Sequence, residues 1–262
     1  MSRPGRWLTA WPPRPAGAAV LLCVPPAGGG CGRYAQWQPL MPPGIGVLGV
    51  ALPGRERRWS EPPASTLADV VDAVTRELGE LTPPELPVVV FGESFGGLIG
   101  YEIARQLSGT PGRRPAALAV AACRPPSMWV GAGRGLADDE DELMSLLNLG
   151  DLGHEVDAET LAEMLDVLRQ DTRLSLTYAG SSHETLACPV HAWGGADDPV
   201  VTSEHLDGWQ AYAGHSFSRR QFPGGHHFCS QPDQAVGRSL AELMASVPAS
   251  HSEPLEESLT WW

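Results

Sequence analysis

Lysine is absent from this sequence of 262 residues, and all 18 of its basic residues are arginine. The absence excludes Schiff-base chemistry on a side-chain amine and any phosphate-binding loop that depends on lysine. Basic residues are also outnumbered, because 31 acidic residues give a formal net charge of −13. A nucleic-acid-binding protein needs a basic face for the phosphates, so we expect no nucleic-acid partner.

A membrane-spanning run and paired cysteines are also missing. The apolar stretch Ala16–Val24 is too short to cross a bilayer, and it lacks a clean signal-peptide cleavage site. The five cysteines are an odd number and contain no CxxC pair, which argues against a disulfide framework. We therefore expect a reduced, cytoplasmic protein that does not associate with a membrane.

Charge is distributed unevenly along the chain. Residues 1–60 hold seven arginines and one acidic residue, a net charge of +6, whereas residues 136–171 hold twelve acidic residues and one arginine, a net charge of −11. Two solvated surfaces would explain this pattern. The alternative is a basic rim that meets an acidic partner, together with an acidic mobile cap.

Short apolar runs alternate with helical patterns along most of the chain. The early runs show little polar alternation, which is typical of strands buried on both faces of a parallel sheet. Apolar residues at helical spacing predict helices over 65–81, 95–107 and 234–247. We therefore predict an α/β fold with a mainly parallel sheet and helices on both faces. The predicted strands are 18–24, 45–52, 87–91, 116–122, 190–193 and 216–222.

One segment departs from this alternation. From Leu136 to Tyr178 the pattern is helical, with acidic residues between the apolar positions. A helical insertion over about residues 136–180 is a candidate lid, although extra core helices would give the same pattern. The length fits one domain, which we place at residues 1–248. The tail 249–262 has no periodicity, and we expect it to be mobile unless its two closing tryptophans dock on the domain.

The string Gly92-Glu93-Ser94-Phe95-Gly96 follows a predicted strand and opens a predicted helix. A GxSxG string alone is weak, but this strand–turn–helix setting is the one that a nucleophile elbow requires. Glycines flank such a serine because side chains there would collide across the tight turn. Ser94 is therefore the candidate nucleophile.

A serine nucleophile needs a base and an acid that orients the base, in the chain order Ser, Asp or Glu, His on this fold. His226 follows a glycine pair in the loop after a predicted strand and is the candidate base, whereas His227 is expected to pack or face solvent. Asp197 and Asp198 both fit a G-x-x-D-x-x-V frame; we favour Asp198 because Pro199 follows it, and Asp197 stays the alternative. A metal site formed by these histidines, Cys229 and the aspartates lacks a recognised ligand spacing, so we expect no metal and no cofactor.

Acyl transfer also needs donors for the oxyanion. One donor should be the backbone N–H of Phe95, the residue after the nucleophile. The other should lie in the loop after the first predicted strand, Pro25–Gly30, where glycines let the backbone approach a substrate. We assign the second donor to the N–H of Ala27, the alternative being a glycine turn that only leads into the helix around 34–40.

These motifs together resemble the type II thioesterases, the stand-alone editing enzymes of polyketide and non-ribosomal peptide assembly lines. The resemblance covers residues 18–247, and its most specific parts are LPGRERR at 52–58 and LRQDTRLSLTY at 168–178. It is also carried by PPAGGG at 25–30, GESFGG at 92–97, GGADDPVV at 194–201 and FPGGHHF at 222–228.

The resemblance implies an α/β-hydrolase fold with a helical lid and hydrolysis of acyl groups from the phosphopantetheine arm of acyl or peptidyl carrier proteins. It implies the same triad and the same oxyanion donors. The family usually has His before the nucleophile and often Met after it, where this chain has Glu93 and Phe95. Glu93 would place a second carboxylate near His226, where it could tune the choice of substrate.

A docking surface for the carrier protein is expected at Arg55, Arg57 and Arg58. This basic cluster follows a strand that should end on the active-site side of the sheet, and carrier proteins are generally acidic. We expect the enzyme itself to be a monomer. The competing functions are a general carboxylesterase or lipase of the same fold, and a hydrolase-fold protein that only binds its ligand.

Overall fold

The structure, a computed structural model, describes residues 7–12, 18–130, 135–147, 156–180, 184–231 and 234–248. One sheet of seven strands has the order β1-β3-β2-β4-β5-β6-β7. Neighbouring strands are parallel except β1, which pairs antiparallel with β3. The strands are β1 (Leu8–Ala10), β2 (Ala19–Val24), β3 (Ile45–Val50), β4 (Val88–Glu93), β5 (Pro115–Ala121), β6 (Val190–Gly195) and β7 (Phe217–Phe222).

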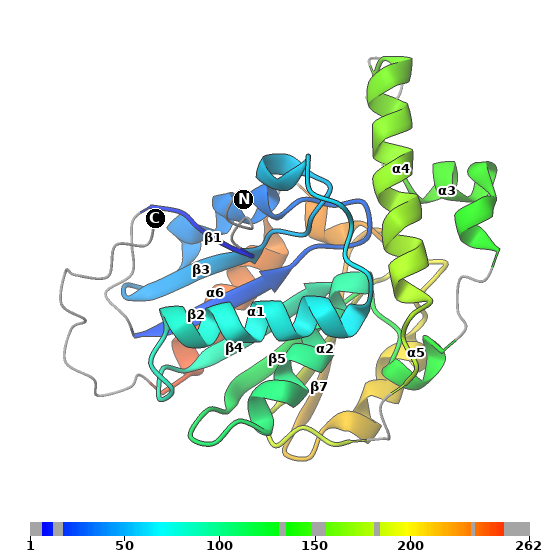
Figure 1. Ribbon diagram of the computed structural model, residues 1–262. Helices are drawn as coiled ribbons and strands as arrows, with labels where there is room; N and C mark the ends of the chain where they lie inside the picture. The colour runs from blue at the N-terminus through cyan, green and yellow to red at the C-terminus, as the bar shows by residue number, and fades with distance from the viewer. Residues whose placement is uncertain are drawn as a thin grey trace.

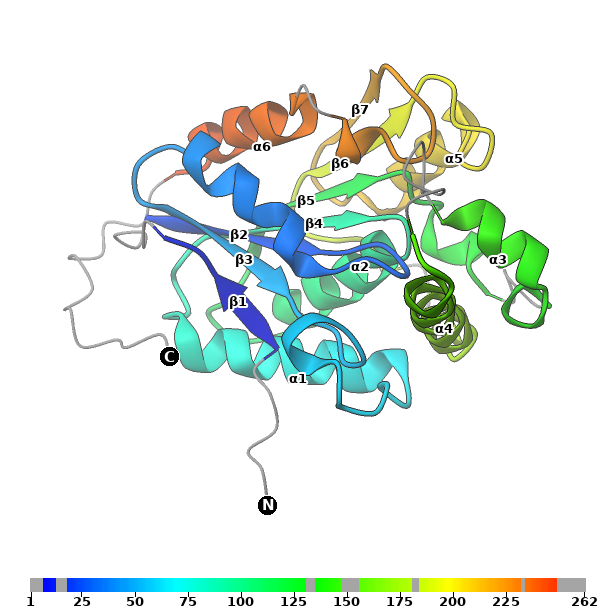
Figure 2. The same ribbon diagram turned by 90° about the horizontal axis from the view of Figure 1, so that it is seen from above.

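Helices cover both faces of the sheet (Figure 2). Helices α1 (Leu67–Leu81) and α2 (Phe95–Ser108) lie on one face, and α6 (Ala235–Ser246) lies on the other with the 3-10 helix η1 (Cys31–Leu40). In β2, Leu22 faces the core on the α1 side while Leu21 and Cys23 face the core on the α6 side. Because both faces are buried, the strand needs apolar residues at every position. The predicted α/β fold is confirmed.

The N-terminal strand β1 is the strand that the sequence pattern did not predict. It has three residues, of which only Leu8 is buried, so it is too short to show a periodicity. Tertiary contacts define it instead: it pairs with β3, and the amides of Trp7 and Leu8 donate to the Glu77 carboxylate of α1.

The predicted insertion consists of helices. These are the 3-10 helix η4 (Leu136–Asp138), α3 (Glu140–Leu146) and α4 (Ala158–Ser175), which we call the lid helices. Helix α4 projects from the body of the molecule (Figure 1). Its first turns are mostly exposed, whereas Leu168, Asp171 and Leu174 further along are buried. Only the second half of α4 is therefore anchored in the fold.

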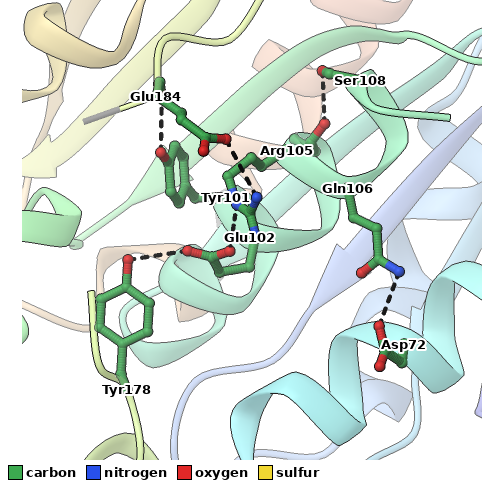
Figure 3. A network of polar contacts seen from close by, with 9 residues as sticks. Asp72, Tyr101, Glu102, Arg105, Gln106, Ser108, Tyr178 and Glu184 are labelled. Carbon is green, nitrogen blue, oxygen red and sulfur yellow. Dashed lines mark hydrogen bonds and ion pairs between the residues drawn. The ribbon is translucent and has the colours of Figure 1, made fainter. Parts of the chain in front are cut away.

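A polar network attaches the chain after α4 to α2 (Figure 3). The Tyr178 hydroxyl donates to the Glu102 carboxylate at 3.0 Å, and Arg105 donates to the same carboxylate at 2.7 Å. Arg105 also pairs with Glu184, and the Tyr101 hydroxyl donates to the Glu184 carbonyl. Helix α2 begins directly after Ser94, the candidate nucleophile, so this network connects the end of the lid to the helix that follows that serine.

The remaining elements are short: η2 (Glu56–Arg58), η3 (Pro126–Met128), α5 (Ser203–Asp207), η6 (Gly208–Tyr212) and η7 (Phe228–Ser230). The five cysteines are buried and unpaired. Within the described ranges, no helix has the length and apolar character needed to cross a membrane. The tail 249–262 lies outside the described residues, and the single domain over 1–248 stays a prediction.

Candidate active site

Ser94 occupies a sharp turn between β4 and α2. Its backbone has φ 51° and ψ −120°, a conformation that non-glycine residues rarely adopt. The Ser94 amide donates to the Ala121 carbonyl of the neighbouring strand at 2.7 Å. Strained backbone of this kind is held by its surroundings and is frequent at active sites. The turn lifts the serine to the carboxyl edge of the sheet.

The glycines around Ser94 are required by close backbone contacts. A Cβ atom on Gly92 would collide with the Gly96 carbonyl, and one on Gly96 would collide with the carbonyl oxygens of Val24 and Pro25. A Cβ atom on Gly97 would lie 2.7 Å from the Cys123 side chain. The elbow therefore packs directly against the loop that follows β2.

His226 and Asp198 reach Ser94 from the loops after β7 and β6. His226 Nε2 lies 3.2 Å from Ser94 Oγ, and His226 Nδ1 lies 2.9 Å from Asp198 Oδ2. The two loops are joined because the Asp197 amide donates to the Gly224 carbonyl at 2.9 Å. Parallel strands bring their carboxyl ends to one edge of the sheet, which is why residues 132 positions apart in the chain meet here.

The Asp198 carboxylate is fully engaged. Its Oδ1 accepts hydrogen bonds from the amides of Val200 and Val201 at 2.7 and 3.0 Å, while Oδ2 contacts His226. Burial alone would raise the pKa of Asp198, but the bonds from His226 and the two amides outweigh it and lower that pKa. Asp197 is exposed. Of the two candidate aspartates, the structure brings Asp198 against the histidine.

A cavity of about 200 Å³ opens at Ser94. Both backbone positions expected to supply oxyanion donors, Ala27 and Phe95, line it together with Ser94 and His226. Phe95 is the first residue of α2, so its N–H has no carbonyl partner within the helix. The rest of the wall is mainly apolar and includes Ala122, Arg124, Trp129, Leu146, Leu168, Asp171, Thr172, Ser175, Val200 and Val201.

The docking surface expected at Arg55, Arg57 and Arg58 is wrong for two of these three residues. Arg55 and Arg58 are buried, and only Arg57 is exposed. Arg58 donates to the Ala51 carbonyl, forms an ion pair with Glu61 at 2.6 Å, and stacks over the Trp7 ring. Buried side chains engaged in this way cannot form a docking surface. The position of these arginines after a strand correctly predicts the edge of the sheet at which they lie. It does not predict whether their side chains are buried or exposed.

Two residues near the site were not singled out from the sequence. Asp171 of α4 forms an ion pair with Arg55 at 2.6 Å and lines the cavity. Glu56 accepts hydrogen bonds from the amides of Cys31 and Gly32, at the start of η1. Both lie in the two motifs that were the most specific for the resemblance, 52–58 and 168–178. The available signal for an ion pair was an arginine, Arg55, in one of these motifs and an acidic residue, Asp171, in the other.

Glu93, directly before Ser94, is 1% exposed. Its carboxylate lies 3.4 Å from Arg33, and neither oxygen accepts a hydrogen bond from the described residues. Burial raises the pKa of Glu93, while Arg33 and His226 oppose that shift. His227 is half-buried, with its ring 5.3 Å from that of His226. No group of three or more potential metal ligands occurs among the described side chains.

Residues 19–244 match the family model of the thioesterase domain. The gramicidin S biosynthesis protein GrsT of Aneurinibacillus migulanus is 31% identical over 231 residues, which cover 87% of this chain and 90% of GrsT. The solved structure of RedJ, a thioesterase from the prodiginine pathway of Streptomyces coelicolor, is 32% identical, covers 89% of each chain and superposes with a TM-score of 0.78.

BorB, the type II thioesterase from the borrelidin biosynthetic cluster, is 30% identical to this chain. The match covers 93% of this chain and all of the BorB chain, with a TM-score of 0.78. The resemblance stated from the motifs is confirmed by these matches. The chain therefore belongs to the thioesterase domain family and has the α/β-hydrolase fold of the type II thioesterases.

Proposed function

We propose that this protein is a serine thioesterase that hydrolyses acyl groups from the phosphopantetheine arm of acyl or peptidyl carrier proteins. In this role it removes aberrant or stalled acyl units from a polyketide or non-ribosomal peptide assembly line. The observation that supports the proposal most directly is that His226 contacts both Ser94 and Asp198 at the cavity. Relatives named for gramicidin S biosynthesis and for the prodiginine biosynthetic pathway support the choice of a carrier-bound thioester as substrate.

Acylation begins when Ser94 Oγ attacks the thioester carbonyl carbon and transfers its proton to His226 Nε2. Asp198 accepts the hydrogen bond from Nδ1–H and stabilises the imidazolium that forms. The carbonyl oxygen gains negative charge, which the N–H groups of Ala27 and Phe95 stabilise. The intermediate then collapses, the C–S bond breaks, and the departing sulfur of the pantetheine arm takes the proton from Nε2.

Deacylation repeats these steps with water as the nucleophile. His226 Nε2 removes a proton from the water as its oxygen attacks the acyl-serine carbonyl. The same two N–H groups stabilise the second oxyanion. Collapse breaks the bond to Ser94 Oγ, which recovers its proton from Nε2, and the free acid leaves. No metal or cofactor enters either half-reaction.

The lid helices control access to this chemistry. Leu146 of α3 and Leu168 of α4 form part of the cavity wall, so a tethered acyl group must pass them to reach Ser94. We place the protein in the cytoplasm as a monomer, where it would meet its carrier proteins.

The test measures release of free acid from a panel of acyl-carrier thioesters by mass spectrometry. The wild-type protein should release acid, and Ser94→Ala should not. Oxygen esters of the same acyl groups are assayed alongside. Faster turnover of the oxygen esters would favour a general carboxylesterase, and binding without turnover by the wild-type protein would favour a non-catalytic ligand-binding protein.

A further inference from the structure

A buried ion pair connects the lid to the loop after β3. Arg55 Nη1 and Nη2 donate to Asp171 Oδ2 and Oδ1 at 2.7 and 2.6 Å. The side chains of Arg55 and Asp171 are 8% and 3% exposed. Two parallel hydrogen bonds between a guanidinium and a carboxylate define one relative orientation of the partners. Together with the buried side chains of Leu168 and Leu174, this pair therefore holds the second half of α4 against the body.

The same two side chains also hold the loop that carries Ala27. The Gly28 amide donates to Asp171 Oδ2 at 2.7 Å, and Arg55 Nη1 donates to the Gly29 carbonyl at 3.0 Å. Gly28 has φ +73°, a conformation that a side chain would strain. The Ala27–Gly28 and Gly29–Gly30 peptide units are thus held by charged side chains from two other segments.

The two ends of this loop are anchored independently of the ion pair. Its start continues from β2, and its end leads into η1, where the Cys31 amide donates to the Glu56 carboxylate at 3.0 Å. Between these anchors, the loop has one internal backbone hydrogen bond among the described residues, from the Gly29 amide to the Pro26 carbonyl at 2.9 Å. The Ala27 N–H belongs to the Pro26–Ala27 peptide, whose carbonyl accepts from the Gly29 amide. Its orientation therefore depends on the Gly28–Gly29 segment, which Asp171 and Arg55 contact.

We propose that Arg55 and Asp171 are positioning residues that orient the Ala27 N–H toward the oxyanion, and that they thereby make the oxyanion hole depend on the placement of α4. The proposal rests on the proposed function, because it takes Ala27 as an oxyanion donor. Displacement of α4 from the body withdraws Asp171 from Gly28 and releases the loop. The lid then controls transition-state stabilisation as well as access to the cavity.

A short-chain alkyl trifluoromethyl ketone is the probe for this proposal. Ser94 Oγ adds to its carbonyl carbon, His226 takes the serine proton, and the resulting oxyanion occupies the site between Ala27 and Phe95. Affinity for the ketone therefore reports the oxyanion hole directly. The ketone inhibition constant, kcat and KM for a small acyl thioester, and Tm are measured for every variant.

Asp171→Asn preserves shape but cannot accept from Arg55 and Gly28 as the carboxylate does. We expect its ketone affinity and its kcat/KM to fall in parallel by about 10- to 100-fold, below the full loss of one oxyanion donor. In a Ser94→Ala background, which cannot form the adduct, the loss of substrate affinity caused by Asp171→Asn should stay well below the loss of ketone affinity. If Asp171→Asn folds poorly, Arg55→Lys replaces it as the test. This milder change keeps the charge, and it should give a smaller loss of ketone affinity in the same direction.

Arg55→Met and Arg58→Met form the matched pair. Both arginines are buried, both are ion-paired and both lie in one loop, but only Arg55 contacts the loop of Ala27. Both substitutions should lower Tm, and only Arg55→Met should weaken the ketone. Equal weakening in the two variants, or unchanged ketone affinity in Asp171→Asn and Arg55→Met, would overturn the proposal.

The wild-type results separate this proposal from the proposed function. Tight ketone binding without release of acid from carrier thioesters would contradict the thioesterase assignment and leave the role of Arg55 and Asp171 to be decided by the variants. A wild-type protein that binds no ketone would overturn the oxyanion-hole assignment and this proposal with it.

Discussion

The two sides of the cavity are held in place by different physical means. The elbow side, formed by Ser94 and the loops of Asp198 and His226, rests on sheet hydrogen bonds and on glycines that admit no Cβ atom. The lid side rests on the ion pair between Arg55 and Asp171 and on a few buried apolar side chains, among them Leu168 and Leu174. Close packing of backbone segments changes little when a helix moves elsewhere in the molecule, whereas an ion pair between two segments is broken when one of them moves. Ser94 is therefore held by contacts that do not involve the lid, and we expect the opposite wall to be the side that can be displaced.

The largest effect should come from the elbow side. Ser94→Ala removes the attacking oxygen and should lower turnover by about 10⁶-fold, because the triad acts as a unit. Acid release from a carrier-bound acyl group measures the loss, and far-UV circular dichroism confirms that the fold is retained. Substantial residual hydrolysis by this variant would show that another group attacks the thioester.

The second prediction separates the adjacent aspartates. Asp198→Asn should lower kcat by about 10⁴-fold, because an amide stabilises the wrong tautomer of the histidine. Asp197 is exposed and makes only a backbone contact to Gly224 in this loop, so Asp197→Asn serves as the control and should retain most activity. The reverse ranking of the two kcat values would reassign the orienting acid.

A matched pair of glycines tests the steric account of the elbow side. Gly96→Ala forces a Cβ atom against the backbone carbonyls of Val24 and Pro25 and should destabilise the protein by about 1–3 kcal/mol or more. Gly79 is exposed in α1, and a Cβ atom added there would meet no other atom within 4 Å, so Gly79→Ala should stabilise by about 1 kcal/mol. Urea unfolding of both variants measures the difference, and equal stabilities would refute the steric argument.

Glu93 is the one buried charge on the elbow side whose carboxylate accepts no hydrogen bond from the described residues. Because its pKa in the folded protein is raised above the ordinary 4.5, the folded state binds the proton more tightly than the unfolded state does. Stability from this group is present below the unfolded pKa and is lost as pH rises through the folded pKa.

Glu93→Gln should remove that pH dependence. The Tm of the variant minus the Tm of the wild-type protein should increase by a few degrees between about pH 4 and pH 7. Differential scanning calorimetry across this range measures the change. A constant difference would mean that Glu93 ionises normally in the folded protein.

The smallest effect concerns what is left of the expected docking surface. Arg57 is exposed and donates to the Leu8 carbonyl at 2.9 Å. Arg57→Ala should lower kcat/KM for a carrier-bound substrate by at most about fivefold, the value of an exposed ion pair, and should flatten its salt dependence. An equal loss with a small untethered thioester would assign Arg57 to the fold instead of to docking.

Much of the fold was predictable because its signals are local. Apolar runs and helical spacing located the six longer strands and the main helices to within a few residues, and Thr66 with Asp69 forms the capping box that begins α1. The three-residue β1 was missed because only tertiary contacts define it. These contacts are its pairing with β3 and the hydrogen bonds to Glu77. Short elements without a period leave no local signal.

The candidate site divides in the same way. Strand–turn–helix context and chain order were sufficient to nominate Ser94, Asp198 and His226, because a parallel sheet brings the carboxyl ends of its strands to one edge. Burial is a property of the assembled structure. The sequence alone therefore determined the six longer strands, the elbow and the order of the catalytic candidates, while only the tertiary structure decided that Arg55 is directed inward to Asp171. That contact joins segments 116 residues apart, and no local pattern encodes such a pairing.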